Sequence, residues 1–298
     1  MTIDLAAAAD FMAAHARMLD RRRFQLLFGE GEPDAVLAAV DAYRNVDGGY
    51  GWGLEPDLRA VESQPGGALH AFEVFEELAP VVASQAVALC DWLGDVSLVD
   101  GGLPFALPVA NPTACAPFWA DADASASSLH ITAAVVGQAH RVARHDRAVA
   151  AHPWLAAATD YCLDGIARLP GPGHAIELMY VVQLLDAVHD IRAEAPVELS
   201  RVAQFLPANG TVHVDGGLED EFLGPLDFSP TPDGALRAHV AADAIVADLD
   251  RLAGLQQADG GWVVDFTSYS PAAGLEWRGY ATVRALSVLR RNGRLPVT

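Results

Sequence analysis

Two short segments place a histidine three residues before a glutamate, a pairing that general acid/base chemistry often uses. The first is His70 with Glu73; the second is His174 with Glu177, followed three residues later by Tyr180. Residues three apart share one face of a helix, so each segment predicts a polar group on a single helical face. A histidine beside a carboxylate can exchange protons near neutral pH. The spacing is also an ordinary way of satisfying partly buried polar side chains, and both interpretations stay open.

A third stretch places two aspartates beside apolar rings. Asp121 and Asp123 follow directly after Phe118 and Trp119, and His130 comes shortly afterwards, where a helix is predicted to begin. Crowded carboxylates beside apolar side chains raise the pKa of one of them, so that it keeps its proton at neutral pH and can donate it as a general acid. We therefore expect this stretch to be the best candidate for catalysis. Capping of a helix by either aspartate is the alternative.

Further polar and aromatic side chains are candidates for binding a substrate. They follow the first glycine-rich loop or lie near the beginnings of predicted helices: Trp52, Glu55, Asp57, His70, Phe118, Trp119, His174, Tyr180, Glu276 and Trp277. Aromatic faces can hold an apolar or cationic group, although aromatic residues are only 8% of the chain. Core packing would explain the same rings. A structural ion pair would likewise explain Glu276-Trp277-Arg278, which otherwise predicts a carboxylate–guanidinium clamp.

The composition limits the class of protein to which such a site can belong. The 298 residues are 52% hydrophobic and carry a net charge of −20. So acidic a chain disfavours binding to phosphate backbones and to anionic membrane surfaces, and we expect no nucleic-acid partner. No apolar run reaches the roughly 18 residues of a membrane span, so no transmembrane segment is expected. The apolar residues must be buried in a large core or around an apolar cavity.

The cysteines and the first residues indicate a compartment. Cys90, Cys115 and Cys162 lie far apart and form no Cys-x-x-Cys pair, which predicts buried thiols in a reducing cytoplasm. The segment that begins at Met1 has no cationic stretch before an apolar one, so no signal peptide is expected.

A loop of sequence Asp-Gly-Gly followed by an apolar residue recurs along the chain. It begins at Asp47, Asp100, Asp215 and Asp259, and a degenerate copy, Asp164-Gly165, lies in the long gap. Glycine after aspartate supplies the left-handed backbone that ends a helix, and the aspartate can accept the amides of the turn. A period of roughly fifty residues predicts a repeated helix pair.

Apolar residues at three- and four-residue spacing predict the helices between these loops. The predicted segments are 5–27, 34–43, 69–78, 81–93, 128–142, 148–169, 175–188, 196–205, 240–255 and 273–289. About six helix pairs would fill the chain. We predict one all-α domain over residues 1–298, an (α/α)6 toroid, because an open solenoid would expose a large apolar face.

One loop carries a family resemblance. In Gln256-Gln257-Ala258-Asp259-Gly260-Gly261-Trp262, the residues Gln256, Gly260 and Trp262 match the Gln-x-x-x-Gly-x-Trp repeat of squalene and oxidosqualene cyclases. The Asp-Gly-Gly loops also resemble those of protein prenyltransferase β subunits, which share the α/α toroid. The resemblance implies an inner and an outer ring of helices, with a central cavity whose mouth is built by the loops that enter the inner helices. It is good support for the fold and weak support for the function.

The chain departs from the catalytic motifs of these families. Class II terpene cyclases protonate an alkene or epoxide through Asp-x-Asp-Asp; Asp121 and Asp123 match two positions, but Ala124 stands where the last aspartate should be. In an alternative register His130 lies among the acidic positions. Asp-Asp-x-x-Asp, the magnesium motif of class I enzymes, does not occur.

Metal motifs are interpreted as chance matches. Asp160-Tyr161-Cys162 has the Asp-x-Cys spacing of the prenyltransferase zinc site but lies ahead of its loop, and no histidine motif follows near the C-terminus. The acidic run Glu219-Asp220-Glu221 is typical of a solvated surface. We predict no metal and no cofactor.

Three functions remain open. The first is a terpenoid cyclase-like enzyme, a cyclase, isomerase or lyase, acting without metal on a hydrophobic substrate with isoprenoids among the candidates. Its acid/base groups would be Asp121, Asp123 and His130, with Glu177 in support. The second is a non-catalytic toroid that binds a lipid, an isoprenoid or a protein. The third is a carbohydrate-active α/α barrel, which would need two opposed carboxylates.

Overall fold

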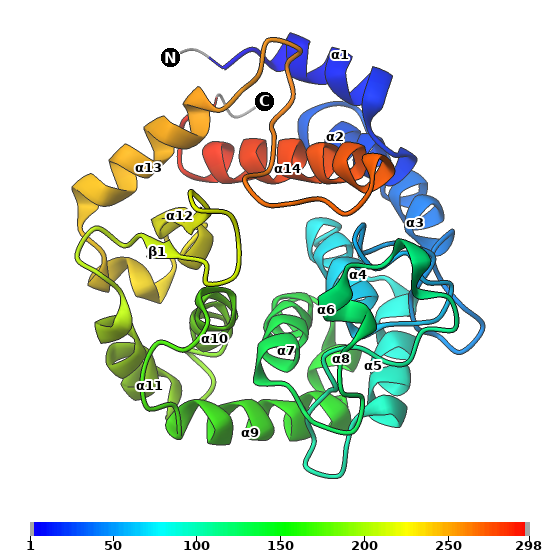
Figure 1. Cartoon of the computed structure of the whole chain (residues 1–298), viewed down its shortest axis with the longest axis vertical. Coiled ribbons are helices and arrows are strands. Elements are labelled where there is room, and N and C mark those ends of the chain that lie inside the picture. Colours follow the sequence, from blue (N-terminus) through cyan, green and yellow to red (C-terminus); the bar gives the residue numbers. More distant parts are fainter. Residues whose placement is uncertain (1–2, 296–298) are drawn as a thin grey trace. The chain divides into compact units, whose positions relative to one another are not determined.

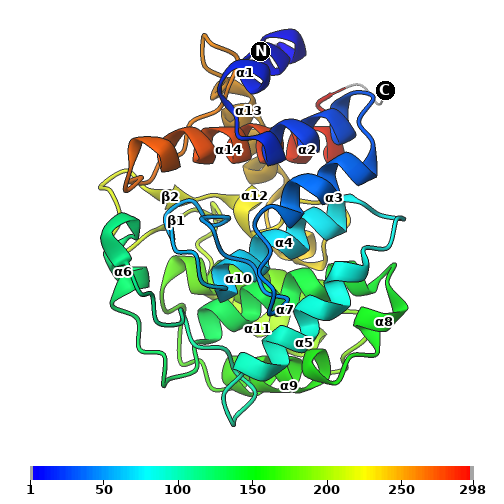
Figure 2. The same ribbon diagram turned by 90° about the vertical axis from the view of Figure 1, so that its right-hand side faces the viewer.

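The computed structural model describes residues 3–295 and is predominantly helical (Figures 1 and 2). These residues form fourteen α-helices and one sheet of two short strands, which confirms the all-α prediction. The chain divides into two compact units. One contains the residues up to Ala39 together with those from Ala203 onward, and the other contains Val40–Val202. The assignment of one domain to residues 1–298 stays a prediction.

The first unit is assembled from both ends of the chain. Its longest helix, α14 (Pro271–Arg291), packs against α1 (Leu5–His15), α2 (Met18–Phe28) and α13 (Ala242–Gly254), and these four helices lie together in both views. The other elements of this unit are α3 (Pro33–Asp41), which ends in the second unit, η2 (Ala203–Phe205), β1 (Val212–His213), β2 (Phe222–Leu223), α12 (Pro225–Phe228) and η3 (Ala235–His239).

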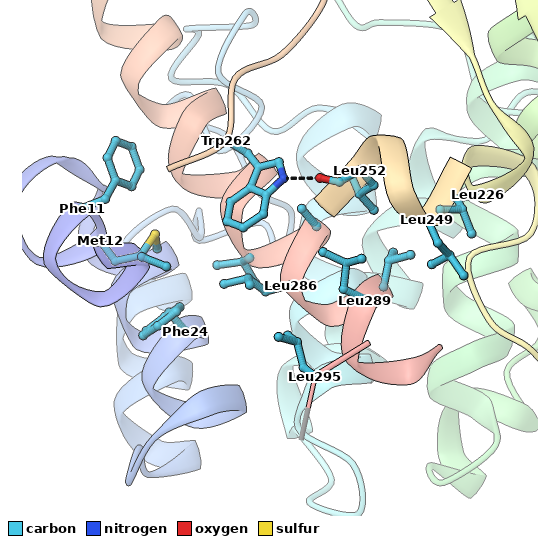
Figure 3. Close-up of a cluster of buried hydrophobic side chains, with 14 of the residues drawn as sticks. Phe11, Met12, Phe24, Leu226, Leu249, Leu252, Trp262, Leu286, Leu289 and Leu295 are labelled. Atoms are coloured by element: carbon cyan, nitrogen blue, oxygen red, sulfur yellow. Dashed lines mark hydrogen bonds between the residues drawn. The ribbon is translucent and has the colours of Figure 1, made fainter. Parts of the chain in front are cut away.

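A continuous hydrophobic core joins these helices (Figure 3). Phe11 and Met12 of α1 and Leu286 of α14 are at most 2% exposed. Trp262 is 1% exposed and donates its indole N–H to the carbonyl oxygen of Leu252, at 2.8 Å. Burial of each such side chain contributes about 1.5–3 kcal/mol. The core therefore holds the first and last helices of the chain in one unit.

The second unit is built around α7 (Leu129–Ala143), which packs against α4 (Pro65–Glu77) and α10 (Ala175–Ala187). Gly137 permits the approach of α10, since a Cβ there would lie 3.5 Å from the Cα of Leu184. The surrounding elements are α5 (Ser84–Val96), η1 (Pro112–Ala114), α6 (Pro117–Ala120), α8 (Arg147–Ala150), α9 (Pro153–Ala167) and α11 (Ala195–Val202).

Three of the Asp-Gly-Gly loops share one hydrogen-bonding scheme. The carboxylates of Asp47, Asp100 and Asp259 each accept the N–H of the second following glycine, at 2.9–3.2 Å. The first glycine of each loop has a φ between 87° and 94°, a conformation that glycine adopts without steric cost. Asp47 and Asp100 also accept a serine hydroxyl that precedes the next helix, so each loop ties the end of one helix to the beginning of another.

Two predicted helices are wrong in extent. The segment 5–27 is divided into α1 and α2, because Ala16 and Arg17 are extended, with ψ of 150° and 158°. The segment 148–169 is divided before Pro153, where His152 has a ψ of 130°. A proline disfavours helical backbone in the residue before it and removes a helix hydrogen bond.

Two predicted loops also differ from the structure. The degenerate copy Asp164-Gly165 lies inside α9 and forms no loop. The loop at Asp215 connects the antiparallel strands β1 and β2 instead of two helices. There the carboxylate of Glu221 accepts the N–H of Leu218, at 3.0 Å, and so closes the connection.

Candidate functional site

The N-terminal ends of α4, α7 and α10 lie at one end of the second unit. His130, in the first turn of α7, lies near His174, the N-cap of α10, and Tyr180, in the second turn of α10, with ring centroids 6.3 and 5.5 Å apart. Gly66, in the first turn of α4, is where the ring of Trp119 approaches α4: a Cβ there would lie 3.3 Å from that ring. Each of these helices follows a connecting loop, so the polar groups in their first turns gather at one end of the unit.

A row of aromatic rings connects these helix ends. Trp119 stacks on Phe105 with centroids 4.5 Å apart and an interplanar angle of 15°. Phe105 in turn meets His130 edge to face, at 5.2 Å. Trp119 is 9% exposed, whereas Phe118 beside it is 50% exposed. His130 thus contacts both this apolar row, through Phe105, and the ring of Tyr180.

The electrostatics of this row are set by burial. Burial and the like charge of His174 lower the pKa of His130 to about 4, so its imidazole is neutral at physiological pH. Within residues 3–295, no hydrogen bond engages either ring nitrogen of His130. Burial raises the pKa of Glu177, whose carboxylate accepts the backbone N–H of His130. Glu177, whose carboxyl group holds its proton more tightly than usual, therefore lies against the first turn of α7, the turn that carries the neutral imidazole of His130.

The other His–Glu pair forms a buried triad of charges. His70 donates Nε2–H to Glu55 and Nδ1–H to Glu73, each at 2.8 Å, as the three-residue spacing of His70 and Glu73 predicted. Burial disfavours charge on the ring, but the two carboxylates outweigh it and raise the pKa of His70 to about 9. The second oxygen of Glu55 accepts the N–H of Asp57, at 3.0 Å. Both ring nitrogens of His70 are thus occupied by protein groups.

The two aspartates of the third stretch are not arranged so that one of them keeps its proton at neutral pH. Asp121 ends α6, and both Asp121 and Asp123 are exposed. Asp123 accepts the hydroxyl and the backbone N–H of Ser125, at 2.6 and 2.9 Å, and these bonds lower its pKa. A proton donor to carbon needs the opposite shift. The turn that Asp123 closes with Ser125 accounts for the aspartate at position 123.

The remaining candidates divide between the two units. In the second unit, Trp52 is 56% exposed, adopts a left-handed φ of 56° and donates its indole N–H to Asn45. Asp57 is 4% exposed. Glu276 and Trp277 belong to α14 in the first unit, where the Trp277 ring meets Phe266 edge to face.

The predicted clamp at Glu276-Trp277-Arg278 has a different partner. Arg278 forms two hydrogen bonds with Asp259, at 2.8 and 2.9 Å, and this ion pair supports the last Asp-Gly-Gly loop. The alternative of a structural ion pair therefore accounts for Arg278.

Clusters of metal ligands and membrane-spanning helices were both sought among residues 3–295. Between residues 3 and 295, no group of three or more His, Cys, Asp and Glu side chains is arranged to hold a metal ion. Asp160 pairs with Arg192 at 2.8 Å while Cys162 is fully buried. In the same range, every helix is too short or too polar to cross a lipid bilayer.

Phe105 is the site residue that the sequence did not indicate. It lies two residues after the Asp-Gly-Gly-Leu loop, where a single ring has no periodic pattern to mark it. Its importance depends on contacts with Trp119 and His130, which are distant in sequence. No family model matches this sequence, and no curated protein does.

Proposed function

We propose that this protein is an acid/base enzyme that acts on a hydrophobic substrate, with isoprenoids among the candidates, in the cavity of an α/α toroid of the terpene cyclase and protein prenyltransferase type. The observation that carries the proposal is that Glu177, whose pKa is raised, lies against the backbone of His130, whose neutral imidazole lies beside a row of aromatic rings.

Glu177 and His130 receive complementary roles. Glu177 donates its proton to an alkene or an oxygen atom of the substrate, and the neutral His130 accepts a proton when the product forms. The substrate gains and loses one proton, and transfer of a proton from His130 back to Glu177 through solvent restores the enzyme. The rings of Phe105, Trp119 and Tyr180 hold the apolar substrate and stabilise developing positive charge through their faces. This assignment moves the acid from Asp121 and Asp123 to Glu177.

Two features support the toroid. The first unit contains both ends of the chain, as expected when a series of helix pairs closes on itself. Gln256 of the repeat motif accepts the N–H of Asp4 and donates to its carbonyl oxygen, at 2.9 and 2.7 Å, which fastens the last loop to the beginning of α1.

The absence of lysine from the sequence excludes one class of catalytic mechanism. All nineteen cationic side chains of the sequence are arginine, and it contains no lysine. A Schiff base with a lysine side chain is therefore excluded, and proton transfer by carboxyl and imidazole groups is the chemistry that the site residues offer.

The test is product formation from squalene, oxidosqualene and polyprenyl diphosphates, followed by gas chromatography with mass spectrometry. Glu177→Gln should lower the rate at least 10²-fold, because the proton donor is lost. Asp123→Asn is the matched control and should leave the rate within twofold, since Asp123 is exposed and closes a local turn. Loss of activity in Asp123→Asn but not in Glu177→Gln would return the acid role to the aspartates.

A non-catalytic binding protein is the second candidate function, favoured by the exposed positions of Asp121 and Asp123. In that case the protein retains an isoprenoid or lipid through purification and converts none of the substrates above. Glu177→Gln would then bind the same ligand as the wild type with unchanged affinity.

A further inference from the structure

His70 has no ring nitrogen available for a substrate. Nε2 bonds to Glu55, Nδ1 bonds to Glu73, and the side chain is only 6% exposed. Because carboxylates accept hydrogen bonds, donation from both nitrogens requires the imidazolium form. Among residues 3–295, Glu55 of the preceding loop and Glu73 of α4 are the groups that favour this charge; α5 and α7, which pack against α4, add none that shifts the pKa of His70.

The carboxylate that His70 holds belongs to a loop that supports another segment. Glu55 accepts the N–H of Asp57, and the carbonyl oxygen of Asp57 accepts the N–H of Ala116, at 2.8 Å. Leu58 forms a bridge with Cys115 in the same region. The loop 54–60 is thus fixed to the segment that carries Trp119.

Glu55 of this loop and the ring of Trp119 both approach α4 at Gly66. A Cβ built on Gly66 would lie 3.3 Å from the Trp119 ring and 3.6 Å from Cγ of Glu55. Trp119 and Glu55 therefore share the space above a residue that has no side chain. The position of Glu55, which His70 fixes, limits where the Trp119 ring can lie.

We propose that His70 is a positioning residue: as an imidazolium bound by Glu55 and Glu73, it holds the loop 54–60 and through it the Trp119 wall against Phe105 and His130. This inference rests on the proposed function in one respect only, namely that the Trp119 wall binds substrate. It assigns to His70 a role other than substrate contact, which the sequence had indicated for it. The link from His70 to Trp119 exists in the protein without ligand and can be measured there.

The first measurement uses ¹⁵N-histidine-labelled wild-type protein. Both ring nitrogens of His70 should stay protonated at pH 7 and titrate together with a midpoint near 9. The His70→Gln spectrum identifies the resonances. A neutral His70 ring at pH 7 in the wild-type protein would overturn the proposal.

The second measurement follows Trp119 by the difference in fluorescence between wild type and Trp119→Phe. The fluorescence that Trp119 contributes should change with pH, with a midpoint near pH 9. In a His70→Gln background, the same difference with and without Trp119 should show no such transition. The control His152→Gln, which alters a partly exposed histidine paired with Asp91, should retain it. A transition that persists unchanged in His70→Gln would contradict the proposal.

Enzyme kinetics separate this inference from the proposed function. If the protein converts a polyene, His70→Gln should raise KM about tenfold with a smaller effect on kcat, because substrate positioning is lost while Glu177 remains. A tenfold fall in kcat with no change in KM would overturn the positioning role. If no substrate is converted, the proposed function fails, and the nuclear magnetic resonance and fluorescence results decide the role of His70 alone.

Discussion

At the scale of single residues, the surroundings give two histidines opposite protonation states. His70 faces two carboxylates, and its pKa is raised to about 9. His130 lies among aromatic rings, and burial lowers its pKa to about 4. Both begin as ordinary imidazoles that titrate near neutral pH. Only the first is suited to holding a charge in place, and only the second to accepting a proton from a reacting group.

The low pKa of His130 predicts a loss of stability in acid. Between pH 6.5 and 4 the unfolded chain binds a proton at this residue and the folded protein does not, so stability falls as the pH falls through this range. His130→Phe should reduce the difference in unfolding free energy between pH 7 and 4.5 by about 1–2 kcal/mol, allowing for partial solvent exposure. Urea unfolding at the two pH values measures the difference, with His152→Gln as control. An unchanged difference in His130→Phe would contradict the burial of this ring.

At the scale of elements, the Gln-x-x-x-Gly-x-Trp segment links α1 to α13 through hydrogen bonds. Gln256 bonds to both backbone groups of Asp4, the residue that caps α1. Trp262 fills the core and bonds to α13 through Leu252. The motif that carries the family resemblance is therefore explained by packing and hydrogen bonding, without any catalytic role.

Gln256→Ala should lower the free energy of unfolding by about 1–2 kcal/mol, because two backbone groups of Asp4 lose their partner. Gln257→Ala is a matched control: its side chain donates only to the nearby carbonyl of Leu255 at the surface, so it should change stability by less than about 0.5 kcal/mol. Chemical denaturation of the two variants makes the comparison. Equal effects would show that the link to α1 contributes nothing.

Two glycines of these loops allow the cost of backbone strain to be distinguished from the cost of a steric clash. Gly260 and Gly216 both have positive φ, 91° and 82°. A Cβ at Gly260 would lie 2.1 Å from the carbonyl oxygen of Ala7, whereas a Cβ at Gly216 would meet nothing within 4 Å. Gly216→Ala should cost about 1–2 kcal/mol through backbone strain alone. Gly260→Ala should cost roughly 3 kcal/mol or more, because α1 must also move. Thermal denaturation that ranks them in the opposite order would contradict the contact with α1.

At the scale of the whole molecule, the net charge of −20 is the dominant feature. With 39 acidic and 19 basic side chains, the folded chain repels itself. Arginine supplies all nineteen side chains of the Lys and Arg type, and several are used in ion pairs such as Arg278 with Asp259 and Arg201 with Glu198.

Salt should therefore stabilise the protein. Raising NaCl from about 0.02 to 0.5 M shortens the Debye length from roughly 20 Å to about 4 Å and screens repulsion between acidic groups. We expect the thermal midpoint to rise by several degrees, as measured by circular dichroism. KCl should act alike, because screening does not depend on the cation. A midpoint that falls with salt would show that attractive ion pairs outweigh the repulsion.

The spacing of apolar residues over short stretches of sequence was sufficient to predict most of the helices. Apolar spacing placed 128–142 and 175–188 within about one residue of α7 and α10. The left-handed glycines of the loops at Asp47, Asp100 and Asp259 were predictable because the Asp-Gly-Gly turn is local. The prediction that they end helices was wrong, because they lie several residues beyond the ends of α3, α5 and α13. The break between α1 and α2 was not, because no proline or glycine marks it and tertiary packing decides it.

Only the tertiary structure decided the chemistry of the site. A carboxyl group becomes a stronger or weaker acid through burial and neighbours, and those neighbours are distant in sequence. Asp123 meets its own turn, whereas Glu177 is half-buried against the backbone of His130, and Glu55 reaches His70 across fifteen residues. The residue types were in the sequence, but the pKa of each side chain depends on which segments the fold packs around it.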